Sequence, residues 1–314
     1  MKRKIILDIE PGITDVLTLY FALFEPTLDV LGITVCGGGN PLPSSLRCVQ
    51  RILDSLQPPK MPRLGVGMGT LPMPMGDWEA FHSSAYFSAM ELPGADYFSV
   101  HPASQIIADL IRENPHEITL VTLGPLTNAA RAFGFGNALS ALLDRLIIVG
   151  GTVLEPGNAT PAAEYNFFRA PSAAAQIFRS NVSKTLVPLD VTNRLTLDYD
   201  LLRRLPGGES MVSQFLHQTV SRLFQLHREL LGVEGIFVPG LIALQAILHP
   251  ENFTARPMYG EVEIHGVQTL GMTIFDRRPH PQNAPNLEVL TEVQTGQIQA
   301  EIYGFLERLS AAVL

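Results

Sequence analysis

The stretch KIILDIEPGITDVLTLYFALF, residues 4–24, decides the fold of this 314-residue chain. It opens with a short apolar run typical of a buried strand, passes through a Pro-Gly turn, and ends in an apolar stretch long enough for a helix. We predict a strand at residues 4–7 and a helix at residues 16–24, with Thr14 or Asp15 near the helix N-cap. A strand that leads directly into a helix is the first half of a βαβ unit.

The same alternation continues outward from this unit. Short apolar runs predict strands at residues 31–35, 118–122, 146–149 and 185–187, and amphipathic stretches predict helices at residues 44–56, 103–112, 126–132 and 172–178. Beyond Asp190 we predict a long helix at residues 209–231, a shorter helix at 241–248, a polar-alternating strand at 261–265 and a last helix at 297–309. We therefore expect an α/β fold in a single domain, residues 1–314, with a mostly parallel, Rossmann-like central sheet flanked by helices.

Composition excludes several classes of protein. The chain is 46% hydrophobic and 17% charged, which excludes a disordered or collagen-like protein. Its formal charge is −8 with no cluster of Lys and Arg, so nucleic acid is not an expected partner. No apolar run is long enough to span a membrane, and the two cysteines lie in no metal or redox pattern. We expect a soluble, cytoplasmic protein with reduced thiols.

Four segments follow predicted strands, which is where ligands bind in a doubly wound sheet: residues 8–15, 36–40, 123–128 and 150–166. The first contains three carboxylates, Asp8, Glu10 and Asp15. Hard oxygens gathered in this way suit Ca²⁺ or Mg²⁺, or a carboxylate that activates water. The alternative is a Pro-Gly turn in which Thr14 and Asp15 only cap the next helix, and this segment by itself favours that alternative.

The fourth segment contains Asn158, Glu164 and Asn166 within nine residues. Amides both donate and accept hydrogen bonds, so this loop could contact several sugar hydroxyls. A polar loop with incidental asparagines explains the same residues equally well.

Together, the first and fourth segments resemble the signatures of the inosine-uridine preferring nucleoside hydrolases. That family has the pattern Asp-x-Asp-Pro-Gly-x-Asp-Asp near its N-terminus, against DIEPGITD at residues 8–15 here. Its central loop reads Gly-Asn-x-Thr-Pro-x-Ala-Glu-x-Asn, against GNATPAAEYN at residues 157–166. Collinear similarity also covers residues 123–128, 189–192, 271–273 and 276–278. The resemblance implies the nucleoside hydrolase fold over nearly the whole chain and cleavage of an N-glycosidic bond.

The resemblance further implies a Ca²⁺ ion that contacts the ribose hydroxyls and the attacking water. Its ligands would be Glu10, Asp15 and the backbone carbonyl of Leu123, and Glu10 would also be the general base. The substrate contacts carried over from the family are Asp8, Thr14, Asn40, Asn158, Glu164 and Asn166. Asn40 takes this place only with a one-residue insertion, since helix spacing puts Gly39 there.

Several positions depart from the family pattern. Glu10 replaces the aspartate base, and Thr14 replaces an aspartate that holds the ribose. The late His-Asp pair of the family falls on Pro239 and Gly240, neither of which can donate a proton or bind a cation through its side chain. Because Ca²⁺ affinity depends on the number of charged ligands, we expect Ca²⁺ to be weakly bound or absent. We interpret the chain as a divergent member with a degraded metal and catalytic site.

The missing histidine leaves the proton donor to the nucleobase unassigned. His227 in the predicted long helix and His82 in the segment that replaces the family's glycine-rich flap are the substitutes that the sequence offers. For either residue, a position at the surface or a hydrogen-bonded position in the interior, without a catalytic role, is the simpler interpretation.

Two functions compete at this point. The first is a hydrolase that cleaves the N-glycosidic bond of a ribonucleoside or related N-riboside with water activated by Glu10. The second is a catalytically inactive protein that binds a nucleoside or ribose. The intact sugar-contacting loop and the basicity of Glu10 favour the hydrolase. The resemblance also implies a homodimer or homotetramer.

Overall fold

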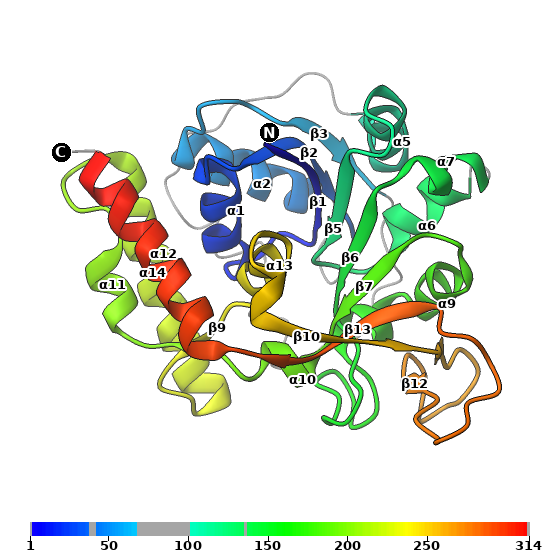
Figure 1. Cartoon of the computed structure of the whole chain (residues 1–314). Coiled ribbons are helices and arrows are strands. Elements are labelled where there is room, and N and C mark those ends of the chain that lie inside the picture. Colours follow the sequence, from blue (N-terminus) through cyan, green and yellow to red (C-terminus); the bar gives the residue numbers. More distant parts are fainter. Residues whose placement is uncertain (1, 38–41, 68–100, 135–136, 313–314) are drawn as a thin grey trace.

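A nine-stranded sheet organises the part of the chain that the computed structural model describes, residues 2–37, 42–67, 101–134 and 137–312. The strand order is β10-β13-β7-β6-β5-β1-β2-β3-β4 (Figure 1), and every neighbouring pair is parallel except β10 with β13. The strands are β1 (Arg3–Ile9), β2 (Leu28–Val35), β3 (Arg63–Val66), β4 (His101–Pro102), β5 (Ile118–Thr122), β6 (Arg145–Val149), β7 (Lys184–Val187), β10 (Phe253–Met258) and β13 (Leu287–Val293). The predicted α/β class with a mostly parallel sheet is confirmed.

Helices cover both faces of this sheet (Figure 1). One face packs against α1 (Asp15–Phe24), α2 (Leu42–Leu56), α12 (Met211–Leu226), α13 (Pro239–Leu248) and α14 (Thr295–Ala312). The other packs against α5 (Ala103–Glu113), α6 (Thr127–Phe133), α7 (Asn137–Leu142) and α9 (Pro171–Arg179). Side chains along β1 alternate between the two cores, with Leu7 and Ile9 in the first and Ile6 in the second, as a strand buried on both faces requires.

Shorter elements connect these layers. They are α8 (Tyr165–Arg169), α10 (Leu189–Thr192), α11 (Asp200–Arg204), the π-helical turn η1 (His227–Leu231) and the 3₁₀ turn η2 (Pro250–Asn252). Two small antiparallel pairs join β8 (Thr196–Leu197) with β9 (Ile236–Phe237) and β11 (Gly260–Val262) with β12 (Thr273–Phe275).

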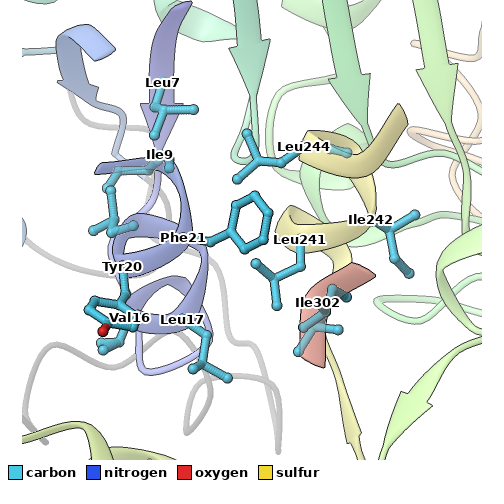
Figure 2. Close-up of a cluster of buried hydrophobic side chains, with 14 of the residues drawn as sticks. Leu7, Ile9, Val16, Leu17, Tyr20, Phe21, Leu241, Ile242, Leu244 and Ile302 are labelled. Atoms are coloured by element: carbon cyan, nitrogen blue, oxygen red, sulfur yellow. The ribbon is translucent and has the colours of Figure 1, made fainter. Parts of the chain in front are cut away.

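Apolar packing holds the start of α13 close to α1. Figure 2 shows Phe21 of α1 directed toward Leu241 and Leu244 of α13, with Leu7 and Ile9 of β1 behind them. All of these side chains are at least 97% buried. The N-terminus of α13 is therefore fixed beside the turn that links β1 to α1.

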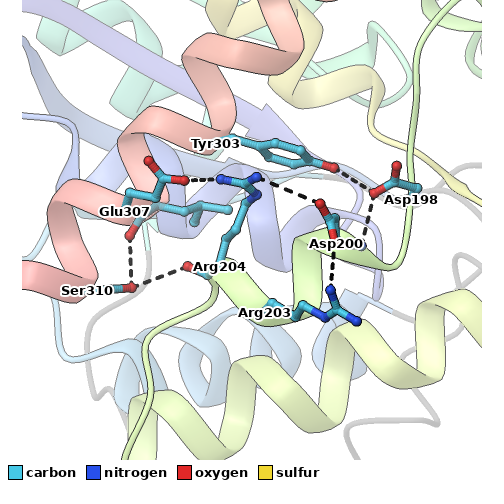
Figure 3. Close-up of polar contacts among 8 residues, drawn as sticks. Asp198, Asp200, Arg203, Arg204, Tyr303, Glu307 and Ser310 are labelled. Atoms are coloured by element: carbon cyan, nitrogen blue, oxygen red, sulfur yellow. Dashed lines mark hydrogen bonds and ion pairs between the residues drawn. The ribbon is translucent and has the colours of Figure 1, made fainter.

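A polar cluster attaches α11 to the last helix, α14 (Figure 3). Arg204 forms an ion pair with Glu307, and its guanidinium lies 4.4 Å from the centre of the Tyr303 ring. The Tyr303 hydroxyl donates to Asp198 at 3.0 Å. The charged groups of the Arg204–Glu307 pair are partly exposed, so this ion pair contributes little to stability.

The structure departs from the predicted elements in several places. The long helix expected at residues 209–231 begins at Met211, because Ser210 caps it, and its last turn becomes η1. The strand expected at residues 261–265 ends at Val262, because the Glu263 carboxylate accepts the main-chain N–H groups of His265 and Gly266 in a turn. Four strands of the central sheet, β3, β4, β10 and β13, were not predicted.

Within the described residues, no helix is long and apolar enough to cross a membrane. Cys36 and Cys48 are both buried and form no disulfide.

Candidate active site

A cavity of about 340 Å³ opens at the carboxyl edge of the sheet, where β1, β5, β6 and β7 end side by side. This is the place predicted for a ligand in a doubly wound sheet. The cavity is lined by Glu10, Thr14, Asp15, Leu123, Val149, Gly150, Asn158, Glu164, Tyr165, Asn166, Leu189, Thr192, Asn193, His227, Leu231, Phe237, Pro239 and Gly240. Its size is in the range of pockets that hold small organic molecules.

The Glu10 carboxylate lies at the end of β1 and is only 3% exposed. Both of its oxygens accept from the Tyr165 hydroxyl, each at 3.0 Å. Burial, with the nearby negative charge of Glu10 adding to it, raises the pKa of Tyr165 well above its usual value. The phenol is therefore a protonated donor to a carboxylate acceptor at neutral pH.

Asp15 and Thr14 stand at the start of α1, beside Glu10. The Asp15 carboxylate reaches back to accept the Gly12 N–H at 2.9 Å, so it helps close the turn before the helix. Thr14 occupies the N-cap position, but its side chain makes no capping hydrogen bond to the helix. Burial raises the pKa of Asp15 to about 7, against the lowering effect of the Gly12 N–H, and the charge of Glu10 raises it further.

Asp8 does not line the cavity. It points from β1 into the protein, is completely buried, and accepts from Thr34 at 2.6 Å and from Asn128 at 2.8 Å through the same oxygen, Oδ1. Burial raises its pKa to about 7. The predicted substrate contact of Asp8 is thus not made from the cavity wall, and its hydrogen bonds instead join β1, β2 and α6.

The sugar-contacting loop predicted from its two asparagines and one glutamate does converge on the cavity. Glu164 caps α8, since its carboxylate accepts the N–H groups of Asn166 at 3.0 Å and of Phe167 at 3.3 Å. The same carboxylate accepts the Gly151 N–H at 3.0 Å. Gly150 has φ = +133°, and a Cβ there would lie 2.5 Å from Glu164 Oε2, so only glycine permits this approach. Burial raises the pKa of Glu164 to about 7 in spite of these donors.

Both asparagines of that loop have structural partners as well. Asn158 accepts the Tyr165 N–H at 2.8 Å. Asn166 donates to the main-chain carbonyls of Leu123 and Val149, both at 3.0 Å. The loop is therefore tied to the ends of β5 and β6, which holds Tyr165 over Glu10.

His227 lines the opposite wall, at the start of η1, and is 2% exposed. Its Nε2 accepts the Phe237 N–H at 3.1 Å, so its proton lies on Nδ1, which donates to the Leu223 carbonyl at 3.0 Å. Burial lowers the pKa of His227 below its usual value. In this arrangement the ring is neutral and both nitrogens bind the main chain.

Pro239 and Gly240 line the cavity at the first turn of α13. A Cβ at Gly240 would lie 2.7 Å from Cγ2 of Thr18, and closer still to its Oγ1. Thr18 of α1 thus fills the space that a side chain at residue 240 would need. Two of the predicted site residues, Asn40 and His82, lie outside the described residues.

These groups do not fit the Ca²⁺ ion that the resemblance implies. Ca²⁺ takes six to eight oxygen ligands, usually with several carboxylates among them. The expected carbonyl of Leu123 accepts from Asn166, the carboxylate of Glu10 accepts from Tyr165, and residue 240 contributes no side chain. Across the described ranges, no group of three or more His, Cys, Asp or Glu side chains could hold a metal.

Sequence reasoning missed Tyr165 and Phe237. Tyr165 lies within the quoted loop, but as the spacer between Glu164 and Asn166 it carried no signal of its own. Its hydroxyl meets Glu10 across 155 residues of sequence, a contact that only the folded chain brings about.

Comparisons with known proteins show the family and the fold of this chain. The family model described as inosine-uridine preferring nucleoside hydrolase matches residues 5–300. The pyrimidine-specific ribonucleoside hydrolase RihA of Photobacterium profundum is 30% identical over 296 residues, which are 93% of this chain and 95% of the relative. RihA of Salmonella typhi is 30% identical over 295 residues, 93% of this chain and 94% of the relative.

Two solved structures share the fold. A plant nucleoside hydrolase, PpNRh1, superposes with a TM-score of 0.87 at 24% identity, over 98% of this chain and 99% of that one. A purine-preferring ribonucleoside hydrolase from Gardnerella vaginalis superposes with a TM-score of 0.86 at 22% identity, over the same shares of the two chains.

Proposed function

Because the chain belongs to the inosine-uridine preferring nucleoside hydrolase family, we propose that the cavity around Glu10 is where it hydrolyses the N-glycosidic bond of a ribonucleoside. Water attacks the anomeric carbon, a C–O bond forms, and the C–N bond breaks with its electron pair leaving on the nucleobase. The proton lost by the water passes to a carboxylate, and the base gains a proton as it departs. The products are the free base and ribose.

Glu10 is the general base in this proposal. The observation that carries it is the burial of one carboxylate at the strand end in a cavity, with both oxygens held by one phenol donor. A positioned carboxylate within reach of a water contributes about 10²–10⁴ in rate. Asp15 also lines the cavity and lies near enough to Glu10 for their charges to interact.

The cavity lining offers groups for both halves of a nucleoside. Polar groups from the strand ends and the loop, Thr14, Asn158, Glu164 and Asn166, would face the ribose hydroxyls. Leu231, Phe237 and Pro239 form an apolar wall that would face the base, with His227 among them. His227 could protonate the leaving base only after exchanging its main-chain partners. Asp8 would act indirectly, because its hydrogen bonds to Thr34 and Asn128 hold together the elements behind the site.

The substrate we propose is a pyrimidine ribonucleoside, since both relatives described above are named pyrimidine-specific ribonucleoside hydrolases. The substitutions at Glu10, Thr14, Pro239 and Gly240 support the interpretation of a divergent member with a degraded metal site. Cytoplasmic location, and assembly as a homodimer or homotetramer, remain proposals that rest on composition and on the resemblance.

The experiment is a Glu10→Gln exchange, which keeps the shape of the side chain and removes its basicity. We expect the wild-type protein to release ribose from uridine or cytidine, and kcat to fall by about 10²–10⁴ in the variant. Reducing-sugar formation is measured on a panel of purine and pyrimidine ribonucleosides. Glu209→Gln, the same exchange at an exposed residue before α12, is the matched control and should leave kcat unchanged.

Two outcomes would contradict this proposal. If Glu10→Gln leaves kcat unchanged, Glu10 is not the base. If the wild-type protein binds uridine but turns over no member of the panel, the chain is the catalytically inactive nucleoside-binding protein that the sequence offered as the alternative.

A further inference from the structure

The Glu10 carboxylate has to be compensated, because a buried charge is costly unless it is paired or hydrogen-bonded. Its two oxygens lie at equal distances, 3.0 Å, from the Tyr165 hydroxyl. A group equidistant from both oxygens lies on the plane that bisects the carboxylate, and a cation bound by both oxygens would lie on that plane too. The phenol is therefore a neutral donor shared by the two oxygens that such a cation would bind.

The neighbouring oxygens that could ligate a cation also accept hydrogen bonds from neutral N–H groups. Asn166 directs its amide N–H groups at the carbonyls of Leu123 and Val149. That places a positive N–H, in place of a cation, against the carbonyl that the resemblance assigned to Ca²⁺. Asp15 in turn accepts the N–H of Gly12.

At the first turn of α13, packed atoms occupy the space beside the site. Thr18 is 1% exposed and occupies the space beside Gly240, so the first turn of α13 brings backbone and apolar atoms where a ligating carboxylate would be needed. These features come from three segments, α8, α1 and α13. In each of them, neutral hydrogen-bond donors or packed atoms stand where the ligands of a cation would be needed.

We propose that this site works without a divalent cation, and that Tyr165 is the positioning residue that holds Glu10 for its role. The inference rests on the proposed function, since it concerns the same carboxylate. In the absence of a metal, the ribose hydroxyls bind through hydrogen bonds to the side chains of the loop, and the attacking water is oriented by Glu10. The hydroxyl of Tyr165 fixes the direction in which Glu10 presents its oxygens to that water.

The first experiment needs no turnover. The wild-type protein is treated with EDTA, dialysed, and titrated with Ca²⁺ by isothermal calorimetry, and its thermal unfolding is followed with and without 1 mM Ca²⁺. We expect no saturable binding up to about 1 mM Ca²⁺, the weak end of the range for protein calcium sites, and no shift of Tm. Uridine binding should be the same in EDTA and in Ca²⁺. Saturable Ca²⁺ binding in the micromolar range, or uridine binding that needs Ca²⁺, would overturn the inference.

The second experiment is Tyr165→Phe, which keeps the ring and removes the hydroxyl. A hydrogen bond to a charged group contributes about 1.5–3 kcal/mol, so we expect kcat to fall by about 10-fold to 100-fold while KM changes much less. A purely structural role would instead lower Tm and change KM together. The matched control is Tyr259→Phe, which removes a tyrosine hydroxyl that also donates to a glutamate, Glu261 of β11. Neither Tyr259 nor Glu261 lines the cavity.

The outcomes separate the two proposals. Ribose release that is abolished by EDTA and restored by Ca²⁺ leaves the hydrolase standing and overturns the metal-free site. A wild-type protein without turnover removes the proposed function, and the calcium titration then still decides the inference. Unchanged kcat in a folded Tyr165→Phe variant shows that Tyr165 does not position Glu10.

Discussion

At the scale of single residues, Gly240 and Thr18 form a matched pair across the contact between α13 and α1. The glycine leaves no side chain on the cavity wall, and the threonine fills the resulting space. Each residue is unfavourable when considered by itself. Glycine in a helix is unfavourable by about 1 kcal/mol relative to alanine, and burying a threonine hydroxyl costs free energy unless the hydroxyl is hydrogen-bonded.

This pairing predicts the response to restoring an acidic side chain. Gly240→Asp should lower the free energy of unfolding by about 1–3 kcal/mol, the usual cost of overpacking. Adding Thr18→Ala should recover part of that loss, because it removes Oγ1 and Cγ2 of Thr18, the two atoms that a Cβ at residue 240 would meet most closely. Urea unfolding of the single and double variants measures both effects. Gly296→Asp is the control, since a Cβ at Gly296 meets nothing within 4 Å. Additive losses in the double variant would show that the two residues are not coupled.

At the scale of elements, the loop between β6 and α8 is held at both ends by carboxylates. Glu164 caps α8 at the far end. Asp190 of α10 holds the near end: its oxygens accept the N–H groups of Val153 and Leu154, both at 2.7 Å, and of Glu155 at 3.3 Å. The loop that carries Asn158 to the cavity is therefore fixed by two carboxylates, one at the N-cap of α8 and one in α10.

We predict that Asp190→Asn loosens the near end of this loop. An amide offers one acceptor oxygen, and its NH₂ group would face N–H donors, so the exchange should cost about 1–3 kcal/mol of stability. Hydrogen exchange of the amides of residues 153–155 should become faster, while the amides of β1 should be protected as before. Asp109→Asn, on the exposed side of α5, is the control. Unchanged exchange at residues 153–155 would mean that the loop is held by other contacts.

At the scale of the whole molecule, burial of carboxylates couples folding to pH. Asp8, Asp15 and Glu164 all have pKa values raised to about 7, in each case mainly by burial. A group with a higher pKa in the folded state holds a proton that the unfolded chain has lost. The stability that it contributes is present below its unfolded pKa and is lost as the pH rises through its folded pKa.

The free energy of unfolding should therefore fall as the pH rises from about 5 to about 7. One group with this shift contributes a slope of at most about 1.4 kcal/mol per pH unit. Glu164→Gln removes this contribution and keeps an oxygen for the cap, so its stability should depend less steeply on pH than that of the wild-type protein. Chemical unfolding at several pH values measures the slopes, with Glu209→Gln as the control. Identical slopes for Glu164→Gln and the wild-type protein would contradict the raised pKa of Glu164.

Most of the central sheet could be predicted from the sequence, because a strand buried on both faces is a continuous apolar run and the helices between strands are amphipathic. The segments at residues 4–7, 118–122 and 146–149 all lie in the strands observed. The strands near the two edges of the sheet could not be recognised. At one edge, β3 and β4 are only four and two residues long. At the other, β10 and β13 mix apolar with exposed polar residues, and their pairing joins residues 29 to 40 positions apart in sequence.

The sequence by itself determined the family and the place of the site, since the signature residues follow the strands in a fixed order and strand ends of a parallel sheet meet at one edge. Only the tertiary structure decided what those residues do to one another. In the folded chain, Asp8 points away from the cavity and both ring nitrogens of His227 form hydrogen bonds with the main chain. Thr18 packs against Gly240, and the Tyr165 hydroxyl donates to Glu10. The physical reason is that hydrogen bonds and packing depend on side-chain directions across distant segments, and no local spacing in the chain encodes them.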